Sequence, residues 1–358
     1  MDLVRTIAMI GVLLLHASGR YVISSRELSQ MNPAAIAQWS IVDLYQSVAV
    51  PLGVPLFLML SGALLLQPAK TDESLGVFFK KRWARIGWPS LFWGAAYFAW
   101  DFLVQGIPFS GAAIIQGILN GPYTQLWYLY VLAGLYLLTP ILRVTIAHAD
   151  ELIIKYFVIL WIVGVAIVPF VDLFSAFRLN SNVFTLTGYV GFFVLGTYLS
   201  TVQIRRKTLA VFILLGVAST AVGTYVMAAT VGGSQMYFFQ QYFSPTVILT
   251  SVAVFLLLFT VKPPNAPKEN DDTVAKVSAG NKLIQLISHN TLGIFFIHVM
   301  VMETIQLGYL GFTINRNTIN PIIEVPIMTV IGLFVSLVII LILKRVPYLK
   351  RLIGAMST

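Results

Sequence analysis

The sequence contains no cysteine and very few charged residues, and each shortage excludes a class of protein. Without cysteine the chain has no disulfides and no thiolate metal sites, and we predict no metal site of any other kind. Only 10% of the residues are charged, whereas 58% are hydrophobic and the mean hydropathy is +0.85. Soluble domains do not have this composition, so the sequence predicts an integral membrane protein.

The apolar residues gather in runs of about 20, the length that an α-helix needs to cross the ~30 Å hydrocarbon layer of a bilayer. We therefore predict an all-α, polytopic protein of the cell membrane, a multi-pass chain in which residues 1–358 form a single transmembrane domain. The predicted spans number about ten: 4–24, 41–67, 84–105, 124–142, 152–173, 184–202, 209–231, 242–262, 284–308 and 322–344.

The basic residues predict how these spans are oriented. With ten spans both termini lie on one side, and most lysines and arginines fall in the loops of that side. The opposite side receives only Arg20, Arg26, Arg178 and Arg316. Cytoplasmic loops of membrane proteins are enriched in lysine and arginine, so we expect both termini in the cytoplasm. The net charge of +9 then reflects orientation and contacts with membrane lipids, and we expect no nucleic-acid partner.

One stretch has the composition of a soluble linker. Residues 262–283 are rich in proline, asparagine, aspartate and lysine and cannot bury a core. We predict that they connect spans eight and nine on the cytoplasmic side.

Arg5 and His16 share one face of the first predicted span. Eleven steps of ~100° make three turns plus ~20°, and they separate the two side chains by ~16 Å along the helix axis. Arg5 would lie at the cytoplasmic mouth and His16 at or beyond the midplane, where a titratable group is costly unless it faces a polar cavity. Imidazole is suited to general-base catalysis near neutral pH. The alternative is that Arg5 only anchors the orientation of the span and that His16 is a hydrogen-bonded histidine with a packing role.

Arg82 and Arg85 begin the third predicted span and also share a face. Forked guanidinium groups bind phosphates well, and with Arg5 on the same side they would form a pocket for a polyanionic molecule. A topology signal or a site for acidic lipid head groups is the alternative for this basic run.

Two further features of the spans concern chemistry or packing. His298 is a second intramembrane histidine, which would either orient His16 or hold the bundle together through an interhelical hydrogen bond. Pro55 predicts a kink in the second span. Ser61 and Gly62, which follow it, form a small pair that allows another helix to approach closely, and packing is favoured over a nucleophilic role for Ser61. Four acids are candidates to partner His16, and the sequence does not choose among them: Asp43, Asp101, Glu303 and Glu324.

These motifs together resemble the membrane-bound acyltransferase-3 family. They are Arg-x10-His in the first span, VPLFLMLSG in the second, RWAR before the third, LWYLYVLAGLYLLTPIL in the fourth, YVGFFVLGTYL in the sixth and ISHNTLGIFFIH in the ninth. The last three are most similar to the surface-polysaccharide O-acetyltransferase branch, which includes the enterobacterial common antigen O-acetyltransferase. The resemblance covers nearly the whole chain.

The resemblance implies an O-acyltransferase that moves an acyl group, usually acetyl from acetyl-CoA as the donor and co-substrate, to a hydroxyl of a lipid-linked or cell-surface glycan. It places the catalytic histidine and its paired basic residue at His16 and Arg5, and the Arg-x-x-Arg motif at Arg82 and Arg85. The match of His298 is weaker. Direct transfer and a covalent acyl-enzyme both remain open, as do the identity of the glycan, a longer acyl donor and a homodimer. The main alternative function is a carrier or flippase for a glycolipid or an anion.

Overall fold

The computed structural model describes residues 1–19, 24–67, 73–175, 188–259, 279–315, 317–346 and 349–353. Within these ranges every regular element is helical and no strand occurs, so the predicted all-α fold is confirmed. Of the described helices, six are long and apolar enough to cross a membrane, and a bent pair makes a seventh if it counts as one span. The chain is therefore an integral membrane protein built from helices.

Each predicted span overlaps a helix within the described residues, but residues 20–23, 184–187 and 260–262 of these spans lie outside them. Not all of the helices are both long and apolar enough to be candidate spans. The six that are comprise Pro33–Leu65, Trp127–His148, Glu151–Phe174, Arg206–Thr230, Gly233–Phe259 and Pro321–Leu343. The first predicted span falls on a helix of 17 residues and the sixth on one of 12. The total of ten spans and the cytoplasmic placement of both termini stay predictions.

The ninth predicted span differs from a single straight helix. It consists of α14 (Ala279–Ser288) and α15 (Thr291–Gln306), which meet at an angle of 79°. Side chains at the break bond to the last turn of α14: Asn290 Nδ2 donates to the carbonyl of Leu286 at 2.6 Å, and Thr291 Oγ1 donates to that of Ser288 at 3.1 Å. Polar residues that bond to the local backbone in this way compete with a continuous helix. Helix α14 also includes residues 279–283, the end of the predicted linker, whose residues 262–278 lie outside the described residues.

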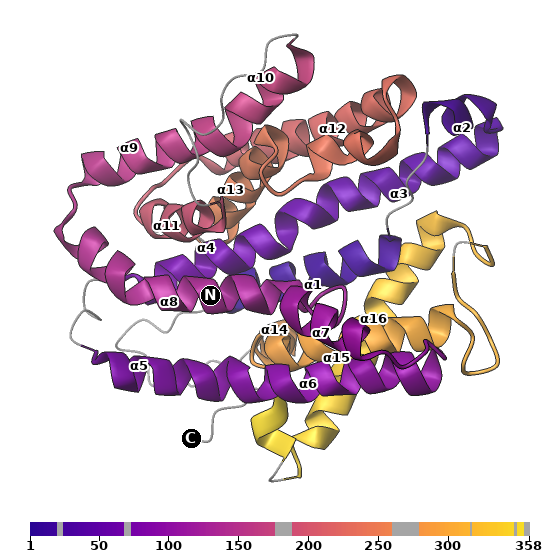
Figure 1. The fold of residues 1–358 in the computed structure, drawn as a ribbon. Coiled ribbons are helices and arrows are strands. Elements are labelled where there is room, and N and C mark those ends of the chain that lie inside the picture. The colour runs from indigo at the N-terminus through magenta and orange to yellow at the C-terminus, as the bar shows by residue number, and fades with distance from the viewer. Residues whose placement is uncertain are drawn as a thin grey trace. The chain divides into compact units, whose positions relative to one another are not determined.

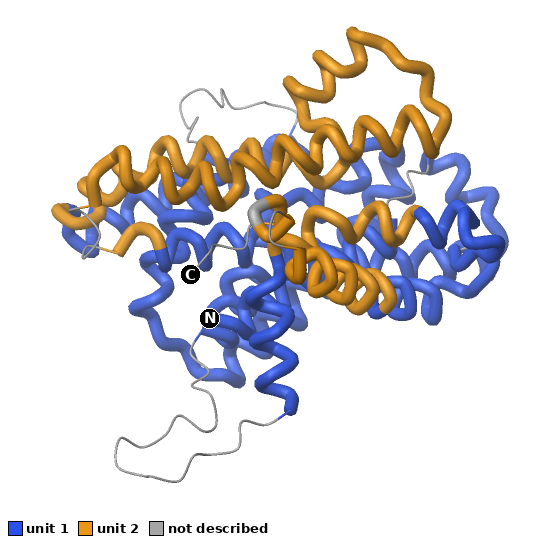
Figure 2. Tube along the Cα trace, turned by 90° about the horizontal axis from the view of Figure 1, so that it is seen from below, with its two compact units in different colours: residues 1–64, 149–291, 304–330 blue, residues 65–148, 292–303, 331–358 orange. Residues whose placement is uncertain are grey.

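The chain divides into two compact units, coloured separately in Figure 2. Unit 1 comprises residues 1–64, 149–291 and 304–330, and unit 2 comprises residues 65–148, 292–303 and 331–358. Helices α15 and α16 (Pro321–Leu343) contribute residues to both. The other helices that lie wholly or mainly in unit 1 are α1 (Asp2–Ser18), α2 (Ser25–Gln30), α3 (Pro33–Leu52), α4 (Val54–Leu65), α9 (Glu151–Ile162), η4 (Val163–Ile167), α10 (Val168–Phe174), α11 (Gly188–Leu199), α12 (Arg206–Thr230), η6 (Gly233–Gln240), α13 (Pro245–Phe259) and α14.

Small residues bring helices of unit 1 close together. A Cβ atom on Gly11 of α1 would lie 2.6 Å from the Cβ of Leu52 in α3. A Cβ on Gly62 of α4 would lie only 1.7 Å from the backbone oxygen of Phe193 in α11. The interface of α4 with α11 therefore requires glycine, and the predicted packing role of the Ser61-Gly62 pair is confirmed at Gly62.

The helix α3–α4 is kinked by a proline, as the sequence predicted. Pro55 has no N–H to donate to the carbonyl of Pro51, four residues earlier. The hydroxyl of Ser251 in α13 lies 3.0 Å from that carbonyl and 2.7 Å from the carbonyl of Val247 in its own helix, so its one proton is shared between them. Gly53, at the break between α3 and α4, has φ −76° and ψ −108°, far from helical values. The missing hydrogen bond is thus replaced in part from a neighbouring helix, as helical membrane proteins commonly do.

Unit 2 contains one long helical rod. Helix α5 (Leu75–Arg82), the π-helical η2 (Trp83–Gly87), α6 (Trp88–Ala99) and the π-helical η3 (Trp100–Val104) follow one another without a break (Figure 1). The rod bears Arg82 and Arg85 toward one end and Trp100 and Asp101 at the other. At 1.5 Å per residue, the arginines lie roughly 25 Å from Trp100. The remaining elements that lie wholly in unit 2 are α7 (Gly111–Asn120), α8 (Trp127–His148) and η7 (Leu349–Ile353).

Candidate functional site

Arg5 and His16 lie on a single uninterrupted helix, α1, as their register predicted. Arg5 is near the start, where its guanidinium pairs with Asp2 at 3.5 Å, and the Asp2 carboxylate also accepts a hydrogen bond from Ser288 Oγ at 2.7 Å. His16 is in the last turn of α1 and is partly exposed. The helix thus carries a cation near one end and an imidazole near the other.

A buried polar group surrounds the C-terminal end of α1. Gln46 of α3 places its Nε2 within hydrogen-bond distance of three acceptors, which share its two protons: the carbonyls of Leu15 and Gly19, at 3.1 and 2.9 Å, and Ser18 Oγ, at 2.6 Å. These three residues lie on either side of His16 in the chain. Carbonyl groups at a helix C-terminus have no partner within the helix. Gln46 therefore fixes the end of the helix that carries His16.

Of the four acidic candidates, Asp43 lies in unit 1, the unit that contains His16. It is 6% exposed, and its Oδ1 accepts a hydrogen bond from Gln240 Nε2 at 2.6 Å. With Gln46 and Gly19 it lines a small cavity. Glu324 also belongs to unit 1, whereas Asp101 and Glu303 belong to unit 2.

Arg82 and Arg85 lie in unit 2, where the π-helical turn η2 begins. The guanidinium carbon of Arg82 is 5.2 Å from the centre of the Phe78 ring and 5.6 Å from that of Tyr136. Arg85 also lies close enough to Tyr136 to interact with it electrostatically. Cation–π contacts hold a guanidinium in place without neutralising it. The guanidinium of Arg82 is thus held by two rings, and no residue that the structure describes forms an ion pair with it.

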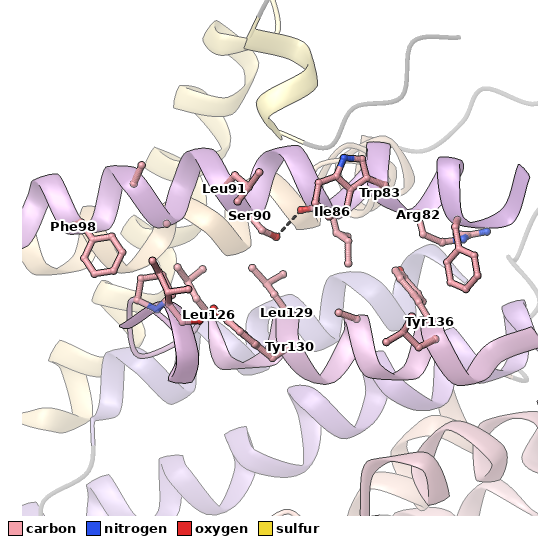
Figure 3. Close-up of a pocket in the computed structure, with 18 of the residues that line it drawn as sticks. Arg82, Trp83, Ile86, Ser90, Leu91, Phe98, Leu126, Leu129, Tyr130 and Tyr136 are labelled. Atoms are coloured by element: carbon pink, nitrogen blue, oxygen red, sulfur yellow. Dashed lines mark hydrogen bonds between the residues drawn. The ribbon is translucent and has the colours of Figure 1, made fainter. Parts of the chain in front are cut away.

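Arg82 borders a cavity of about 630 Å³ between the long rod, α7 and α8. The view in Figure 3 shows Arg82 and Tyr136 near one end, with Phe98 toward the other. The wall is apolar along most of its length, and the hydroxyls of Ser90 and Tyr130 are both bonded to backbone carbonyls, those of Ile86 and Ile118. The cavity is therefore amphipathic, with its positive charge at the Arg82 end.

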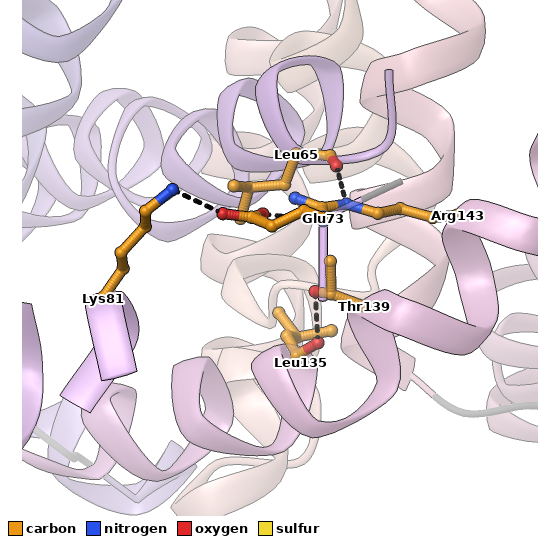
Figure 4. A network of polar contacts seen from close by, with 6 residues as sticks. All are labelled: Leu65, Glu73, Lys81, Leu135, Thr139 and Arg143. Atoms are coloured by element: carbon orange, nitrogen blue, oxygen red, sulfur yellow. Dashed lines mark hydrogen bonds and ion pairs between the residues drawn. The ribbon is translucent and has the colours of Figure 1, made fainter. Parts of the chain in front are cut away.

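A network that sequence reasoning missed stands beside this arginine. Glu73 bridges Lys81, at 2.8 Å, and Arg143, at 3.0 Å (Figure 4). The Arg143 guanidinium also donates to the carbonyl of Leu65 at 2.7 Å and lies 4.8 Å from the centre of the Phe78 ring. Hydrogen bonding to Lys81 is the largest influence that lowers the pKa of Glu73, with Arg143 adding to it against the opposing effect of burial.

Arg143 and Arg82 therefore contact the same ring, that of Phe78, and form one basic cluster with Arg85. The sequence offered a signal for Arg143, because it is a charged residue directly after the apolar run of the fourth predicted span. By sequence alone it counts only among the basic residues that predict the orientation of the spans. Its 3% exposure shows that it is a buried side chain rather than a loop residue.

His298 is completely buried in unit 2. Its Nδ1 lies 2.8 and 3.1 Å from the carbonyls of Phe295 and Ile294 in its own helix. Since carbonyls only accept, Nδ1 carries the proton in this arrangement and the ring is neutral or doubly protonated. His16 and Arg5 belong to unit 1, whereas His298 joins Arg82 and Arg85 in unit 2.

A second polar group in unit 2 surrounds Glu303. Its Oε2 accepts hydrogen bonds from Tyr123 at 2.5 Å, Trp100 at 3.0 Å and Gln105 at 3.2 Å. The ring of Tyr123 stacks on that of Tyr97 with their centres 4.3 Å apart. These contacts occupy Glu303 within unit 2. Among all the residues that the structure describes, no three histidine, aspartate or glutamate side chains gather as they would around a metal ion.

The comparisons with known proteins give one match. The family model described as "Acyltransferase domain" matches residues 1–341. No curated protein and no solved structure matches the chain. All five predicted site residues fall within the matched range: Arg5, His16, Arg82, Arg85 and His298.

Proposed function

The chain belongs to the acyltransferase-3 family and is a membrane acyltransferase, and on this premise we propose that it transfers an acetyl group from acetyl-CoA to a glycan hydroxyl. The observation that carries the acyl transfer is the family match over residues 1–341. The acetyl donor, the lipid-linked or cell-surface glycan as acceptor and the surface-polysaccharide branch are parts of the proposal.

The basic cluster of unit 2 supports CoA as the carrier of the acyl group. CoA is a polyanion with three phosphates, and Arg82 and Arg85 present guanidinium groups beside aromatic rings, whereas Arg143 is paired with Glu73 and held by the Leu65 carbonyl. Arginine forks bind phosphate oxygens in pairs. We assign phosphate binding in unit 2 to Arg82 and Arg85, and we propose Arg5 of unit 1 separately as a phosphate-binding residue.

His16 is the proposed general base. It removes the proton from the acceptor hydroxyl while the hydroxyl oxygen forms a bond with the thioester carbonyl carbon. The carbon–sulfur bond then breaks, the sulfur leaves as CoA thiolate, and the proton passes from His16 to that sulfur. The products are an acetyl ester and CoA-SH. His16 lies in the last turn of α1, at the helix end that Gln46 holds in place.

Replacement of His16 tests this role. His16→Ala should lower the transfer of label from [14C]acetyl-CoA to membrane glycans at least about a hundredfold, the usual loss when a general base is removed. Binding of CoA, measured as a ligand-dependent rise in unfolding temperature, should persist. The matched control is His289→Ala, since His289 is exposed between α14 and α15. Near-normal transfer by the His16 variant would overturn the assignment.

Replacement of Arg82 tests the donor site separately. Arg82→Met should weaken CoA binding at least tenfold because a phosphate contact is lost, and Arg82→Lys should recover only part of it because lysine lacks the fork. Unchanged CoA affinity in Arg82→Met would remove this residue from the donor site.

Carriers also contain broken helices such as the pair α14–α15, so the carrier function is tested as the alternative. Purified protein in lipid vesicles separates the two functions. An enzyme consumes acetyl-CoA and adds roughly 42 Da to each modified sugar, the mass of an acetyl group that replaces a hydrogen. A carrier moves a glycolipid between leaflets and leaves the thioester intact, and that outcome would refute the acyltransferase proposal.

A further inference from the structure

A small cavity lies at the C-terminal end of the helix that carries His16. It is lined by Gly19, Trp39, Val42, Asp43, Gln46, Tyr237 and Gln240, all from unit 1, and its volume is about 10 Å³. That volume holds one group of the size of a water molecule or a hydroxyl. Both glutamines are 1% exposed.

The hydrogen bonds around the cavity fix which atom of each amide is the oxygen. Gln46 Nε2 faces the carbonyls of Leu15 and Gly19, and Gln240 Nε2 faces two oxygens of Asp43, at 2.6 and 3.5 Å. Carbonyl groups only accept, so a flipped Gln46 would place oxygen against oxygen, and so would a flipped Gln240 beside the Asp43 carboxylate. The assignment of nitrogen and oxygen in the side-chain amides of Gln46 and Gln240 is therefore fixed by their partners.

This orientation leaves two acceptors in need of a donor. Gln46 Oε1 and Gln240 Oε1 are both buried and have no hydrogen-bond donor among the residues that the structure describes. Buried polar atoms without a partner are rare in folded proteins, and each one calls for an explanation. Here two of them, from helices α3 and η6, belong to side chains that line the same cavity, beside a carboxylate.

We propose that this cavity, the hydroxyl pocket, receives a hydroxyl group of the acceptor and thereby positions a neighbouring hydroxyl for His16. The inference rests on the proposed function. An occupant must donate hydrogen bonds, because both unpartnered atoms are acceptors. It must also be no larger than one hydroxyl, because about 10 Å³ admits no sugar ring.

The hydroxyl that binds here is not the one that reacts. An amide oxygen is too weak a base to remove its proton, so a hydroxyl bound to Gln46 or Gln240 keeps that proton. The proton of the reacting hydroxyl is therefore removed by His16. Gln46 contacts the chain on both sides of His16, at the carbonyls of Leu15 and Gly19. The acceptor must therefore carry at least two adjacent hydroxyls, as sugars do, and a simple alcohol or amine would bind poorly.

The test measures transfer of label from [14C]acetyl-CoA to glycans in membrane vesicles. Gln46→Met and Gln240→Met each remove an amide of the pocket at nearly constant volume, and Val42→Ile adds one methyl group to its wall without touching the amides. All three should lower transfer at least tenfold and leave CoA-dependent thermal stabilisation as in the wild type. The matched control is Ser47→Ala, since Ser47 is next to Gln46, completely buried and outside the pocket lining. It should stay within twofold of the wild type.

The outcomes separate the two proposals. If the folded glutamine variants and Val42→Ile transfer label within twofold of the wild type, the pocket holds only water and the inference is overturned, while the proposed function stands. A failure of either glutamine variant to fold leaves Val42→Ile to decide, because it keeps every hydrogen bond. Wild-type protein that transfers no label in a His16-dependent manner would overturn the proposed function and this inference with it.

Discussion

The two ion pairs of Glu73 should differ several-fold in their contribution to stability, although their lengths are nearly equal. The bond to Lys81 is 2.8 Å long and that to Arg143 is 3.0 Å. The side chain of Lys81 is 56% exposed, whereas that of Arg143 is 4% exposed and that of Glu73 is 17% exposed. Burial therefore distinguishes the pairs, and distance does not.

The loss of stability in each variant depends on which charges remain unpaired after the substitution. Glu73→Gln leaves the buried guanidinium of Arg143 without its carboxylate, which costs roughly 3 kcal/mol when a buried pair is broken from one side. Lys81→Ala removes an exposed partner whose charge was already screened by solvent, and it should cost at most about 1 kcal/mol. Arg143→Met combined with Glu73→Gln should cost less than the sum of the single changes, because no unpaired charge then remains.

The measurement is equilibrium unfolding in mixed detergent micelles, followed by tryptophan fluorescence, for the single and double variants of two cycles. The coupling energy of Glu73 with Arg143 should be about 2 kcal/mol, and that with Lys81 should stay below about 0.5 kcal/mol. A Lys81 variant that loses as much stability as Glu73→Gln would refute the reasoning, since it would mean that pair length outweighs burial.

Three further predictions concern packing, the proline kink and pH. Gly62→Ala should destabilise the protein by at least roughly 2 kcal/mol in thermal unfolding because its Cβ would lie 1.7 Å from the Phe193 backbone oxygen; the control Gly134→Ala, with nothing within 4 Å, should be neutral or stabilising. Ser251→Ala removes the donor to the kinked helix α3–α4 and should cost about 1–2 kcal/mol in the same assay, and a loss below the error would mean that this bond contributes nothing. The folded pKa of Glu73 lies below its ordinary value of 4.5, so its contribution is complete above the ordinary pKa and is lost as pH falls through the folded pKa. The stability difference between wild type and Glu73→Gln should therefore shrink as pH falls below 4.5, and a constant difference would contradict it.

Local patterns were enough to predict the helices and the kink. Apolar runs predicted helical spans because a bilayer leaves the backbone no partner outside the helix. Pro55 predicted a kink because a missing N–H is a property of the residue itself. The register of Arg5 and His16 depended only on the period of an α-helix, and α1 confirms it.

Contacts between distant residues were decided by the tertiary structure. Gln240 and Asp43 are separated by 197 positions, and Arg143 and Glu73 by 70. The bend at Asn290 also escaped prediction, because whether a polar residue caps a helix or faces a neighbour depends on what packs against it.

The sequence by itself thus determined the class of protein, the helical segments, the register of Arg5 with His16 and the family resemblance, since each depends on residue type and short-range spacing. The tertiary structure alone decided that Arg143 joins Arg82 at the ring of Phe78, and that two buried amides end at one cavity beside the helix of His16. The physical reason is that hydrogen bonds and ion pairs across helices depend on which faces meet, and that choice is made by packing over the whole chain.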